Sequence, residues 1–590
     1  MLKIFKHMRK DTWTLLLLSI LVVIAQVWVD LRIPDYMTTI TILVKTEGSP
    51  MNEIWNAGIM MLLCAVLAMG LSLLSGFVSA RLAALFSRDL RSDIFNAVEN
   101  FSLEEIDRFS TASLITRSTN DVTQIQNFMS RGLRMIINTP ITVTIAMIKI
   151  WGKSWQWTSL LGAGVVMVLM VVIYLIKYAH PRFRRMQLLT DNLNQVTREN
   201  LTGIRVVRAY NAEGYMQDKF SEANDILTDN ALQARRAMNL MRPVMRFTNN
   251  GLTVGIYCVG AYIIASQLGT GDALVTFSEM VVFSTYAARV LGSFMSLNMI
   301  FNMLPRATVS AERINEILDT DPSIKDGPET EGVAGQEGTV EFRNVSFRYP
   351  AAEDDILKDI SFTAKKGETV AFIGATGSGK TSLVNLVPRF YDAGKGEVLV
   401  DGRNVKEYDQ TALRKKIGYA PQRAVLFTGT VASNLKYGEY KDMDESEESA
   451  QAEIEKAVSI AQAEDFVKAM RGGYDADITR GGTNVSGGQK QRLSIARSIF
   501  RRPEIYIFDD TFSALDYKTD RLLRARLKKE TAGVTTLIVA QRIGTIRDAD
   551  KIIVLDEGRI VGEGTHDELM KNCEVYKEIA LTQLSEEELA

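Results

Sequence analysis

Long uncharged stretches alternate with charged segments over the first half of the chain. A helix that crosses the hydrocarbon layer of a membrane needs about 20 residues, and four stretches approach or exceed this length: 12–29, 54–80, 156–176 and 247–271. Two further apolar runs are less regular, since Met135–Ile148 ends before Lys149 and the run from Met280 is interrupted at Arg289 before it resumes over Val290–Pro305. Buried helices of a soluble domain are the alternative for these two. We count them as spans, because six crossings return the chain to its starting side.

Positive charge marks the side on which the chain starts. Lysine and arginine precede the first span and are frequent in 81–134 and 177–246, whereas the connection 30–53 is mildly acidic. Basic loops stay in the cytoplasm, so we expect a multi-pass protein of the lipid bilayer with a cytoplasmic N-terminus and a cytoplasmic second half. The first apolar stretch is too long for the core of a cleavable signal peptide, and no small-residue cleavage site follows it, so we expect it to remain.

Both long cytoplasmic segments have a helical pattern and are far longer than ordinary connections. We expect them to extend the membrane helices into the cytoplasm, with chain reversals near 109–114 and 207–213. Ordinary helix hairpins without a docking role are the alternative reading of these reversals.

Polar residues within the expected spans are candidates for a substrate cavity. A charge in the membrane is costly unless it faces water or a partner, so Arg289 either faces a cavity or lies near the interface with its side chain extended to water. Asn138 and Asn298 either line the same cavity or bridge neighbouring helices.

The pattern changes after residue 305. A linker over 306–338 contains prolines and glycines, and from Thr339 onwards short alternating apolar runs are interleaved with helical patterns. We therefore expect an all-α six-helix transmembrane domain over 1–305, fused to an α/β domain over 339–576 and followed by a tail over 577–590. The net charge of −2 gives no reason to expect a nucleic-acid partner.

The segment Gly374–Thr381 fits G-x-x-x-x-G-K-[ST] and follows the apolar run Val370–Ile373. Glycines allow backbone N–H groups to approach an anion, and the following helix points its positive end at the same place. Lys380 is then expected to reach the β/γ-phosphates of a nucleotide, and Thr381 to reach Mg²⁺. The α/β domain over 339–576 is therefore expected to be a P-loop nucleotide-binding domain. The candidate nucleotide-binding residues of this loop are Gly374, Thr376, Gly377, Ser378, Gly379, Lys380, Thr381 and Ser382.

Two further motifs follow downstream. The apolar run Ile505–Phe508 ends in Asp509 and Asp510, as in a buried parallel strand that delivers carboxylates to its C-terminal edge, and Asp509 is the expected Mg²⁺ partner. Between the two sites, Ser486, Gly487, Gly488 and Gln489 form a glycine turn that leads into a helix and suits a second phosphate group. One chain hardly needs both phosphate sites for one nucleotide, whereas two chains packed head to tail would use both.

This ordered set resembles an ATP-binding cassette (ABC) transporter of the exporter type, with six helices before one nucleotide-binding domain, and the resemblance covers essentially the whole chain. It implies ATP and Mg²⁺ as cofactors, and a dimer that sandwiches two ATP molecules. By resemblance, Tyr349 stacks on adenine, Gln422 senses Mg²⁺ and the membrane domain, and Asp516 belongs to a loop that crosses to the partner. The reversals near 109–114 and 207–213 resemble the coupling segments that dock on nucleotide-binding domains.

The departures from the family pattern concern catalysis. The family normally has Glu after the Mg²⁺-binding Asp, and here Asp510 is one methylene shorter. The switch histidine of the family is replaced by Gln541, which has no proton that titrates near neutral pH. Arg480 stands where relatives often have Glu. Phosphoryl transfer depends on positioning and charge stabilisation, so the resemblance implies a degenerate site that binds ATP and hydrolyses it slowly.

The nearly standard segment 486–489 implies a homologous second half-transporter, whose competent site it completes. The chain thus resembles one subunit of the heterodimeric bacterial multidrug exporters, located in the bacterial cell membrane and moving hydrophobic or amphipathic small molecules out of the cytoplasm. Lipid, peptide or haem export and a regulatory ATP-binding subunit are the alternatives for function. A homodimer with two slow sites is the alternative for assembly.

Overall fold

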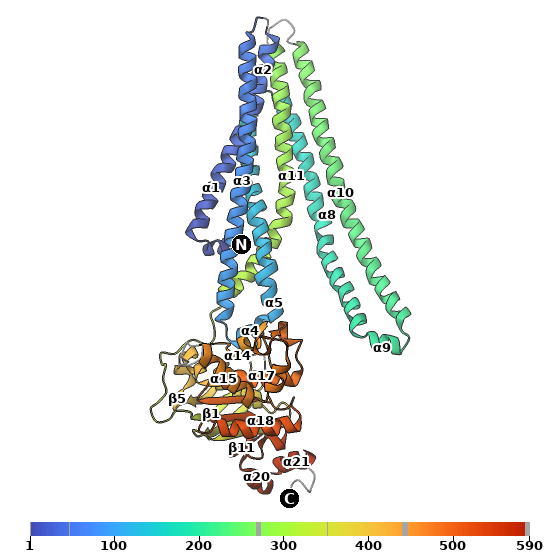
Figure 1. Cartoon of the computed structure of the whole chain (residues 1–590). Coiled ribbons are helices and arrows are strands. Elements are labelled where there is room, and N and C mark those ends of the chain that lie inside the picture. Colours follow the sequence, from blue (N-terminus) through green and yellow to red (C-terminus); the bar gives the residue numbers. More distant parts are fainter. Residues whose placement is uncertain (1, 47, 267–272, 351, 439–446, 584–590) are drawn as a thin grey trace. The chain divides into compact units, whose positions relative to one another are not determined.

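The computed structural model describes residues 2–46, 48–266, 273–350, 352–438 and 447–583 (Figure 1). They form two compact units, of which one comprises 1–99 and 112–320 and the other comprises 100–111 and 321–590. We call them the membrane unit and the nucleotide unit.

The membrane unit is helical throughout its described secondary structure. It begins with the 3₁₀ helix η1 (Leu2–His7), and the π-helical turns η2 (Arg117–Asp121) and η3 (Phe128–Gly132) separate three of its shorter helices. Its α-helices are α1 (Lys10–Asp30), α2 (Ile33–Lys45), α3 (Met51–Glu99), α5 (Thr111–Thr116), α6 (Val122–Asn127), α7 (Leu133–Ile150), α8 (Trp155–Thr202), α9 (Ile204–Ala209), α10 (Glu213–Ser266) and α11 (Ala273–Leu318).

Four helical segments of the described chain are long and apolar enough to cross a membrane: Lys10–Val44, Met51–Glu99, Thr111–Ile150 and Trp155–Thr202. They contain four of the expected spans, including the irregular run Met135–Ile148. The other two expected spans fall on α10 and α11, which are long helices outside that set of four, and residues 267–271 lie outside the described residues. The count of six spans therefore stays a prediction.

The first span continues further than its apolar stretch. The segment 30–53, which we expected to be a connection, is helical over Ile33–Lys45, and only a short turn at residues 31–32 separates α2 from α1. Tyr286 is fully buried and donates its hydroxyl to the Leu31 carbonyl at 2.8 Å and to Asp35 Oδ1 at 2.9 Å. Lys149 Nζ lies 2.6 Å from Asp35 Oδ2. The acidic residue of α2 is thus paired inside the membrane unit.

Both expected chain reversals are present. Ser110, at φ 61°, separates α4 from α5, and Asn211, at φ 50°, follows α9. Figure 1 shows α8 and α10 side by side with α9 joining them. The helical extensions that the sequence predicted for 177–246 are therefore confirmed. Helix α11 continues past residue 305, the expected end of the transmembrane domain, to Leu318.

The described residues of the nucleotide unit form three sheets. Its strands are β1 (Val340–Phe347), β2 (Leu357–Ala364), β3 (Thr369–Gly374), β4 (Lys395–Val400), β5 (Arg403–Asn404), β6 (Ile417–Ala420), β7 (Gly429–Thr430), β8 (Asp477–Ile478), β9 (Ile505–Asp509), β10 (Thr535–Val539), β11 (Lys551–Asp556) and β12 (Arg559–Gly564). The largest sheet has the order β12-β11-β3-β10-β9-β6, in which β12 alone is antiparallel to its neighbour. An antiparallel sheet has the order β2-β1-β4-β5, and β7 pairs with β8.

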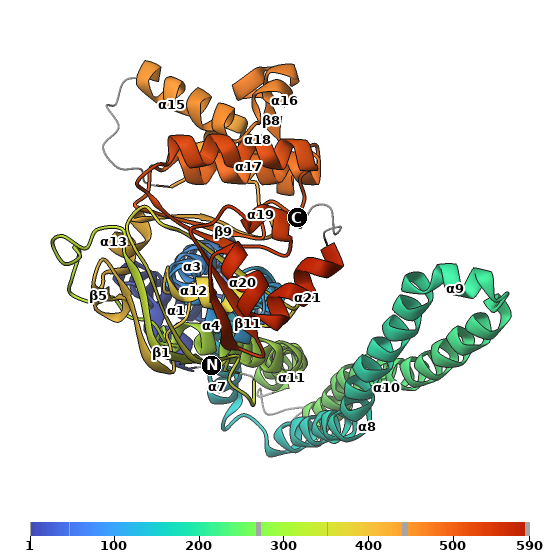
Figure 2. The ribbon, with the colours of Figure 1, turned by 90° about the horizontal axis from the view of Figure 1, so that it is seen from below.

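Helices cover this framework, and Figure 2 shows α15, α17 and α18 as neighbours. The helices are α4 (Leu103–Phe109), α12 (Lys380–Leu386), α13 (Gln410–Lys415), α14 (Val431–Leu435), α15 (Glu447–Ile460), α16 (Glu464–Ala469), α17 (Gly487–Phe500), α18 (Tyr517–Glu530), α19 (Ile543–Ile546), α20 (His566–Asn572) and α21 (Glu574–Gln583), with 3₁₀ turns η4 (Val405–Glu407), η5 (Gly473–Asp475) and η6 (Arg480–Gly482).

Strand β3 shows why the sheet can carry a site at its edge. Its residues Ala371 and Ile373 belong to one hydrophobic core, and Val370 and Phe372 belong to a second core. Alternate side chains of a strand point to opposite faces, so the large sheet is buried on both sides. Its strands are fixed by packing, and polar groups that follow their C-terminal ends are held in place.

Candidate nucleotide-binding site

The phosphate loop connects β3 to α12. Gly377 and Gly379 have φ of 88° and 97°, which favour glycine. A Cβ on Gly379 would also lie 2.7 Å from Leu357 Cδ2, so the sequence leaves no room for a side chain there. Thr376 and Gly377 are exposed, whereas Ser378 is buried. The outer rim of the loop is therefore open to a ligand.

Lys380 is the first residue of α12, and its side chain lies against the phosphate loop. Its Nζ donates to the carbonyl oxygens of Gly374 and Ala375 at 2.8 Å each, and to Ser378 Oγ at 3.3 Å. Burial lowers the pKa of Lys380, and the charges of Asp510 and Asp509 oppose this effect. If an anionic ligand bound at the loop, the Lys380 ammonium group would contact its negative charge in place of the two carbonyl oxygens.

Thr381 and Asp509 meet across the site. The hydroxyl of Thr381 donates to Asp509 Oδ1 at 2.9 Å, and Asp509 is 2% exposed at the end of β9. Burial is the main cause that raises the pKa of Asp509. A hydroxyl and a buried carboxylate are suitable oxygen ligands for Mg²⁺, and a cation would offset the burial of that charge. These two residues therefore fit the predicted Mg²⁺ site.

Asp510 follows β9 and has a φ of 49°. Its backbone N–H donates to the Val539 carbonyl of neighbouring β10 at 2.9 Å. Its Oδ2 accepts from Gln422 Nε2 at 3.2 Å and from Gln541 Nε2 at 2.9 Å. Burial raises the pKa of this carboxyl group, and the amide donors favour its ionised form. The structure thus brings the predicted residues 422, 510 and 541 together.

Sheet order explains this convergence. Gln422, Asp510 and Gln541 follow β6, β9 and β10, which are adjacent parallel strands. Parallel strands present their C-terminal ends at one edge of the sheet. The side chain of Gln583 on α21 adds a contact that the sequence did not indicate, since its Nε2 donates to the Gln541 carbonyl at 2.7 Å. Part of the segment expected to be a tail, 577–590, is therefore helical, and its residue Gln583 contacts the backbone of Gln541.

Tyr349 lies beside the phosphate loop, where its hydroxyl is 3.0 Å from Ser382 Oγ. Its ring packs edge-on against Tyr391, with ring centroids 5.1 Å apart. The hydroxyl of Tyr391 in turn donates to Asp107 Oδ2 on α4 at 2.9 Å. Burial is the main cause that raises the pKa of Tyr391. No sequence pattern predicts this link between α4 and Tyr349, because the two bonded residues are 284 positions apart.

The predicted second phosphate segment forms a helix cap. Ser486 caps α17, because its Oγ accepts from Gln489 N at 3.4 Å while Gln489 Oε1 accepts from Ser486 N at 2.8 Å. Ser486 and Gly487 are exposed, and Gly488 is partly exposed. Among the described residues, no hydrogen bond or ion pair joins this segment to the phosphate loop of the same chain. Its helix end is therefore available to another molecule.

Asp516 caps the next helix, with its Oδ1 accepting from Thr519 N at 3.0 Å at the start of α18. This backbone hydrogen bond is the main cause that lowers the pKa of Asp516.

Gln491, on α17, was not singled out from the sequence. It is buried, and its Nε2 donates to the carbonyls of Pro421 and Gln422 at 3.2 Å each, which joins α17 to the segment that carries Gln422.

The candidate cavity residues of the membrane unit occupy separate positions. Arg289 forms a two-point ion pair with Asp30, with Nη1 to Oδ2 at 2.6 Å and Nη2 to Oδ1 at 3.2 Å. Asn138 accepts from the Thr142 hydroxyl at 2.7 Å on the same helix. Asn298 lies on α11, and its side chain is outside the described part of the structure. A cavity role for these three stays a prediction.

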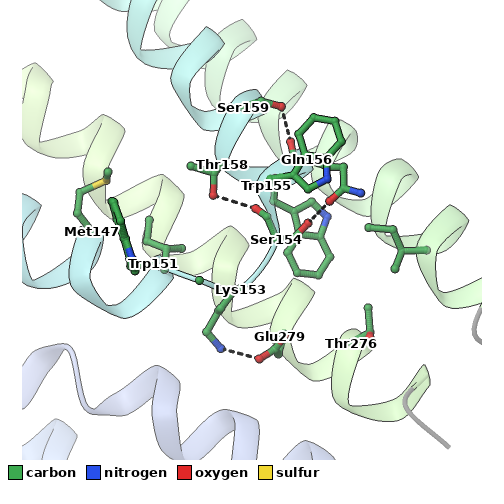
Figure 3. A pocket seen from close by; sticks show the side chains of 14 residues that line it. Met147, Trp151, Lys153, Ser154, Trp155, Gln156, Thr158, Ser159, Thr276 and Glu279 are labelled. Atoms are coloured by element: carbon green, nitrogen blue, oxygen red, sulfur yellow. Dashed lines mark hydrogen bonds and ion pairs between the residues drawn. The ribbon is translucent and has the colours of Figure 1, made fainter. Parts of the chain in front are cut away.

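A pocket of about 840 Å³ lies in the membrane unit at the junction of α7 and α8. Figure 3 shows Trp151, Trp155 and Met147 at this junction and Lys153 pointing towards Glu279 of α11. Lys153 Nζ lies 3.3 Å from Glu279 Oε1. Neither Arg289 nor Asn138 lines this pocket. Trp side chains are frequent at membrane interfaces, so this junction is typical of the end of a membrane span.

Comparisons with known proteins match both units. The ABC transporter transmembrane region matches residues 16–293, and the ABC transporter domain matches 357–513. An uncharacterized ABC transporter ATP-binding protein of Mycobacterium tuberculosis is 41% identical over 512 residues, which are 86% of this chain and 85% of that protein. The ATP-dependent lipid A-core flippase of Pseudomonas fluorescens is 32% identical over 511 residues, or 86% and 82% of the two chains. The structure of a bacterial Atm1-family ABC exporter with ATP bound is similar with a TM-score of 0.78 and 25% identity, over 97% of this chain and 99% of that one.

Proposed function

The chain belongs to the ABC transporter family, and we propose that it is one half of an ATP-driven exporter with two unequal ATP sites. It spans the membrane and carries its ATP-binding domain in the cytoplasm. The proposal adds three points. The ATP site of this chain is degenerate, its segment 486–489 completes the site of a homologous partner, and its substrates are hydrophobic or amphipathic small molecules.

The hydrogen bond between Gln541 and Asp510 is the observation that carries the proposal. The Asp510 carboxylate is 7% exposed, and Oδ2 already accepts from two amide groups. A carboxylate that is one methylene shorter than glutamate and held by these donors is poorly placed to orient an attacking water. Gln541 can hydrogen-bond a phosphate group but cannot exchange a proton near neutral pH. Both features favour slow hydrolysis.

Binding of ATP does not depend on these two residues. The phosphate loop has an open rim, and Lys380 is positioned to contact phosphate oxygens. Thr381 and Asp509 would hold Mg²⁺, which supplies charge neutralisation for the phosphates when it is bound. Tyr349 is positioned beside the same loop to pack against the base. We therefore infer that the site retains ATP and turns it over slowly.

The exposed helix end at Ser486 supports a role for a second chain. Backbone N–H groups at the start of a helix bind phosphate, and this helix end makes no hydrogen bond to the phosphate loop of its own chain within the described residues. A homologous partner that has Glu and His at the positions equivalent to 510 and 541 would supply the fast site. Export of a lipid is the second candidate function, because one relative is an ATP-dependent lipid A-core flippase.

Co-purification with a homologous half-transporter, followed by ATPase measurements, tests the proposal. The chain alone should bind ATP and hydrolyse it poorly, and the pair should hydrolyse it faster with stimulation by hydrophobic cations. Removal of the partner's catalytic carboxylate should reduce turnover more than Asp510→Ala does. Rapid turnover by the solitary chain, or equal losses from the two substitutions, would contradict unequal sites. Stimulation by lipids alone would favour the second candidate.

A further inference from the structure

A groove with charged and apolar parts lies between α1 and α3 of the membrane unit. Its volume is about 720 Å³, and its lining changes character along the two helices. Arg9, Arg81 and Arg88 occupy the end at which α1 begins. This end lies on the cytoplasmic side, because α1 starts from the cytoplasmic N-terminus and α3 returns the chain to that side. The groove therefore lies at the level of the cytoplasmic leaflet.

The three arginines differ in their pairing. Arg9 and Arg88 both approach Asp89, a carboxylate with a side chain only 4% exposed, at 3.7 Å and 2.7 Å. Arg81 is exposed and has no hydrogen bond or ion pair to any described residue. Asp11 also lines this end, and Arg9 lies 3.9 Å from a further carboxylate, that of Asp93 outside the lining. Arg81 is therefore the arginine of the groove that no carboxylate of the described residues approaches. One cation is thus available to a ligand that carries a single negative charge.

The opposite end of the groove is apolar and faces the bilayer. Leu18 and Leu74 are each 45% exposed, and Phe77 is 63% exposed. The buried hydroxyls of Ser19 and Ser79 are 3.1 Å apart and join α1 to α3 at this level. This hydrogen bond holds the two helices together beside the groove, while the apolar walls remain open to acyl chains. The change from charged to apolar follows the change from headgroup region to hydrocarbon.

We propose that this groove binds one anionic phospholipid of the cytoplasmic leaflet. The phosphodiester contacts Arg81 and the outer face of Arg88, and an acyl chain lies along Leu74 and Phe77. Charge complementarity selects the occupant, because Arg81 has no ion pair with a described residue and this cation lies at headgroup depth. A neutral hydrophobic compound would leave Arg81 without a partner. A soluble phosphate would leave the apolar walls uncovered.

Lipid binding to the full-length protein tests this site. Native mass spectrometry of the purified chain should show stronger binding of phosphatidylglycerol than of phosphatidylcholine with the same acyl chains. Arg81→Gln should weaken phosphatidylglycerol binding about fivefold, which is the effect of one basic group near an anionic lipid. Arg81 makes no ion pair with a described residue, so this substitution removes a charge without breaking a contact that supports the fold.

Lys177→Gln is the matched control. Lys177 is exposed and directly follows the apolar stretch 156–176, as Arg81 directly follows 54–80, but it does not line the groove. Its substitution should leave the preference unchanged. Equal losses in the two variants would indicate general attraction of anionic lipids and overturn a specific site. Competition by glycerol 3-phosphate as effective as that by the lipid would show an anion site without a role for the apolar walls, and would equally overturn the proposal.

Discussion

Gln541 and Asp510, two residues that depart from the family pattern, are hydrogen-bonded to each other. Gln541 Nε2 donates to Asp510 Oδ2 at 2.9 Å, and the strands before them are neighbours in the sheet. A glutamate at 510 would extend its carboxylate one methylene further towards the phosphate loop. A histidine at 541 would add a group that can donate to phosphate and exchange a proton. Both departures from the family pattern therefore change the same hydrogen-bonded pair of side chains.

The first prediction is that Asp510→Glu and Gln541→His together raise ATP hydrolysis more than the two single substitutions combined. Repositioned acid–base groups contribute about 10²-fold or more. A longer carboxylate at 510 is not enough while residue 541 has no proton that titrates near neutral pH, and a histidine at 541 is not enough while the carboxylate at 510 is too short. Turnover of labelled ATP by the purified chain, alone and with its partner, measures the gain. Lys380→Ala in the double variant should abolish the gain. Unchanged turnover with unchanged ATP binding would contradict the role given to these residues.

The second prediction concerns the link from α4 to Tyr349 through Tyr391. Tyr391→Phe removes the hydrogen bond to Asp107 and keeps the ring that packs against Tyr349. A lost hydrogen bond to a charged group costs about 1.5 kcal/mol or more. We expect ATP affinity within about twofold of the original, and a drop in substrate-stimulated ATPase of about tenfold, equivalent to 1.4 kcal/mol.

Tyr391→Ala is the comparison for that experiment, because it also removes the ring beside Tyr349 and should weaken ATP binding. Helix α4 follows α3 in the chain after the non-helical residues 100–102. Loss of stimulation with retained ATP affinity in Tyr391→Phe is the result expected if the hydrogen bond to Asp107 takes part in coupling. Parallel loss of affinity and stimulation in Tyr391→Phe would show that the hydroxyl only supports the local fold.

Local patterns predicted the elements that carry the candidate nucleotide site, whereas pairs of residues far apart in the sequence were not predicted. The phosphate loop and the acidic end of β9 depend on apolar runs and turn residues that are adjacent in sequence, so the convergence of residues 422, 510 and 541 follows from strand order. The helix α2 was missed because Asp35 reads as a solvated charge until Lys149 and Tyr286 are seen beside it. The contact of Gln583 with Gln541 was missed because a short polar helix near the end of a chain has no distinguishing pattern.

The third prediction is that Arg289 and Asp30 are coupled. Their side chains are 48% and 30% exposed, so the pair is partly screened and its coupling should be about 1 kcal/mol. Arg289→Ala and Asp30→Ala should each lower the thermal midpoint, and the double substitution should cost less than the sum. The single Arg289→Ala should alter substrate-stimulated ATPase more than basal ATPase if the pair lies beside a cavity. Additive losses would show that the two residues act independently.

The last prediction concerns stability at mildly acidic pH. The buried ring of His566 lies with Nδ1 2.7 Å from the Tyr576 hydroxyl. Burial is the main cause that lowers the pKa of His566; the charge of Arg547 adds to it, and Asp567 and Asp548 oppose it. The folded state therefore prefers the neutral ring. As pH falls below about 6.5, the ordinary value for histidine, the unfolded chain takes up a proton first, and stability is lost until the folded pKa is reached.

Thermal midpoints of the full chain, measured from neutral to mildly acidic pH, should decline in this window. His566→Gln keeps a hydrogen-bonding side chain without this titration, and should reduce the decline while the carboxyl groups continue to titrate as before. The same slope in both proteins would assign the acid sensitivity to groups other than His566.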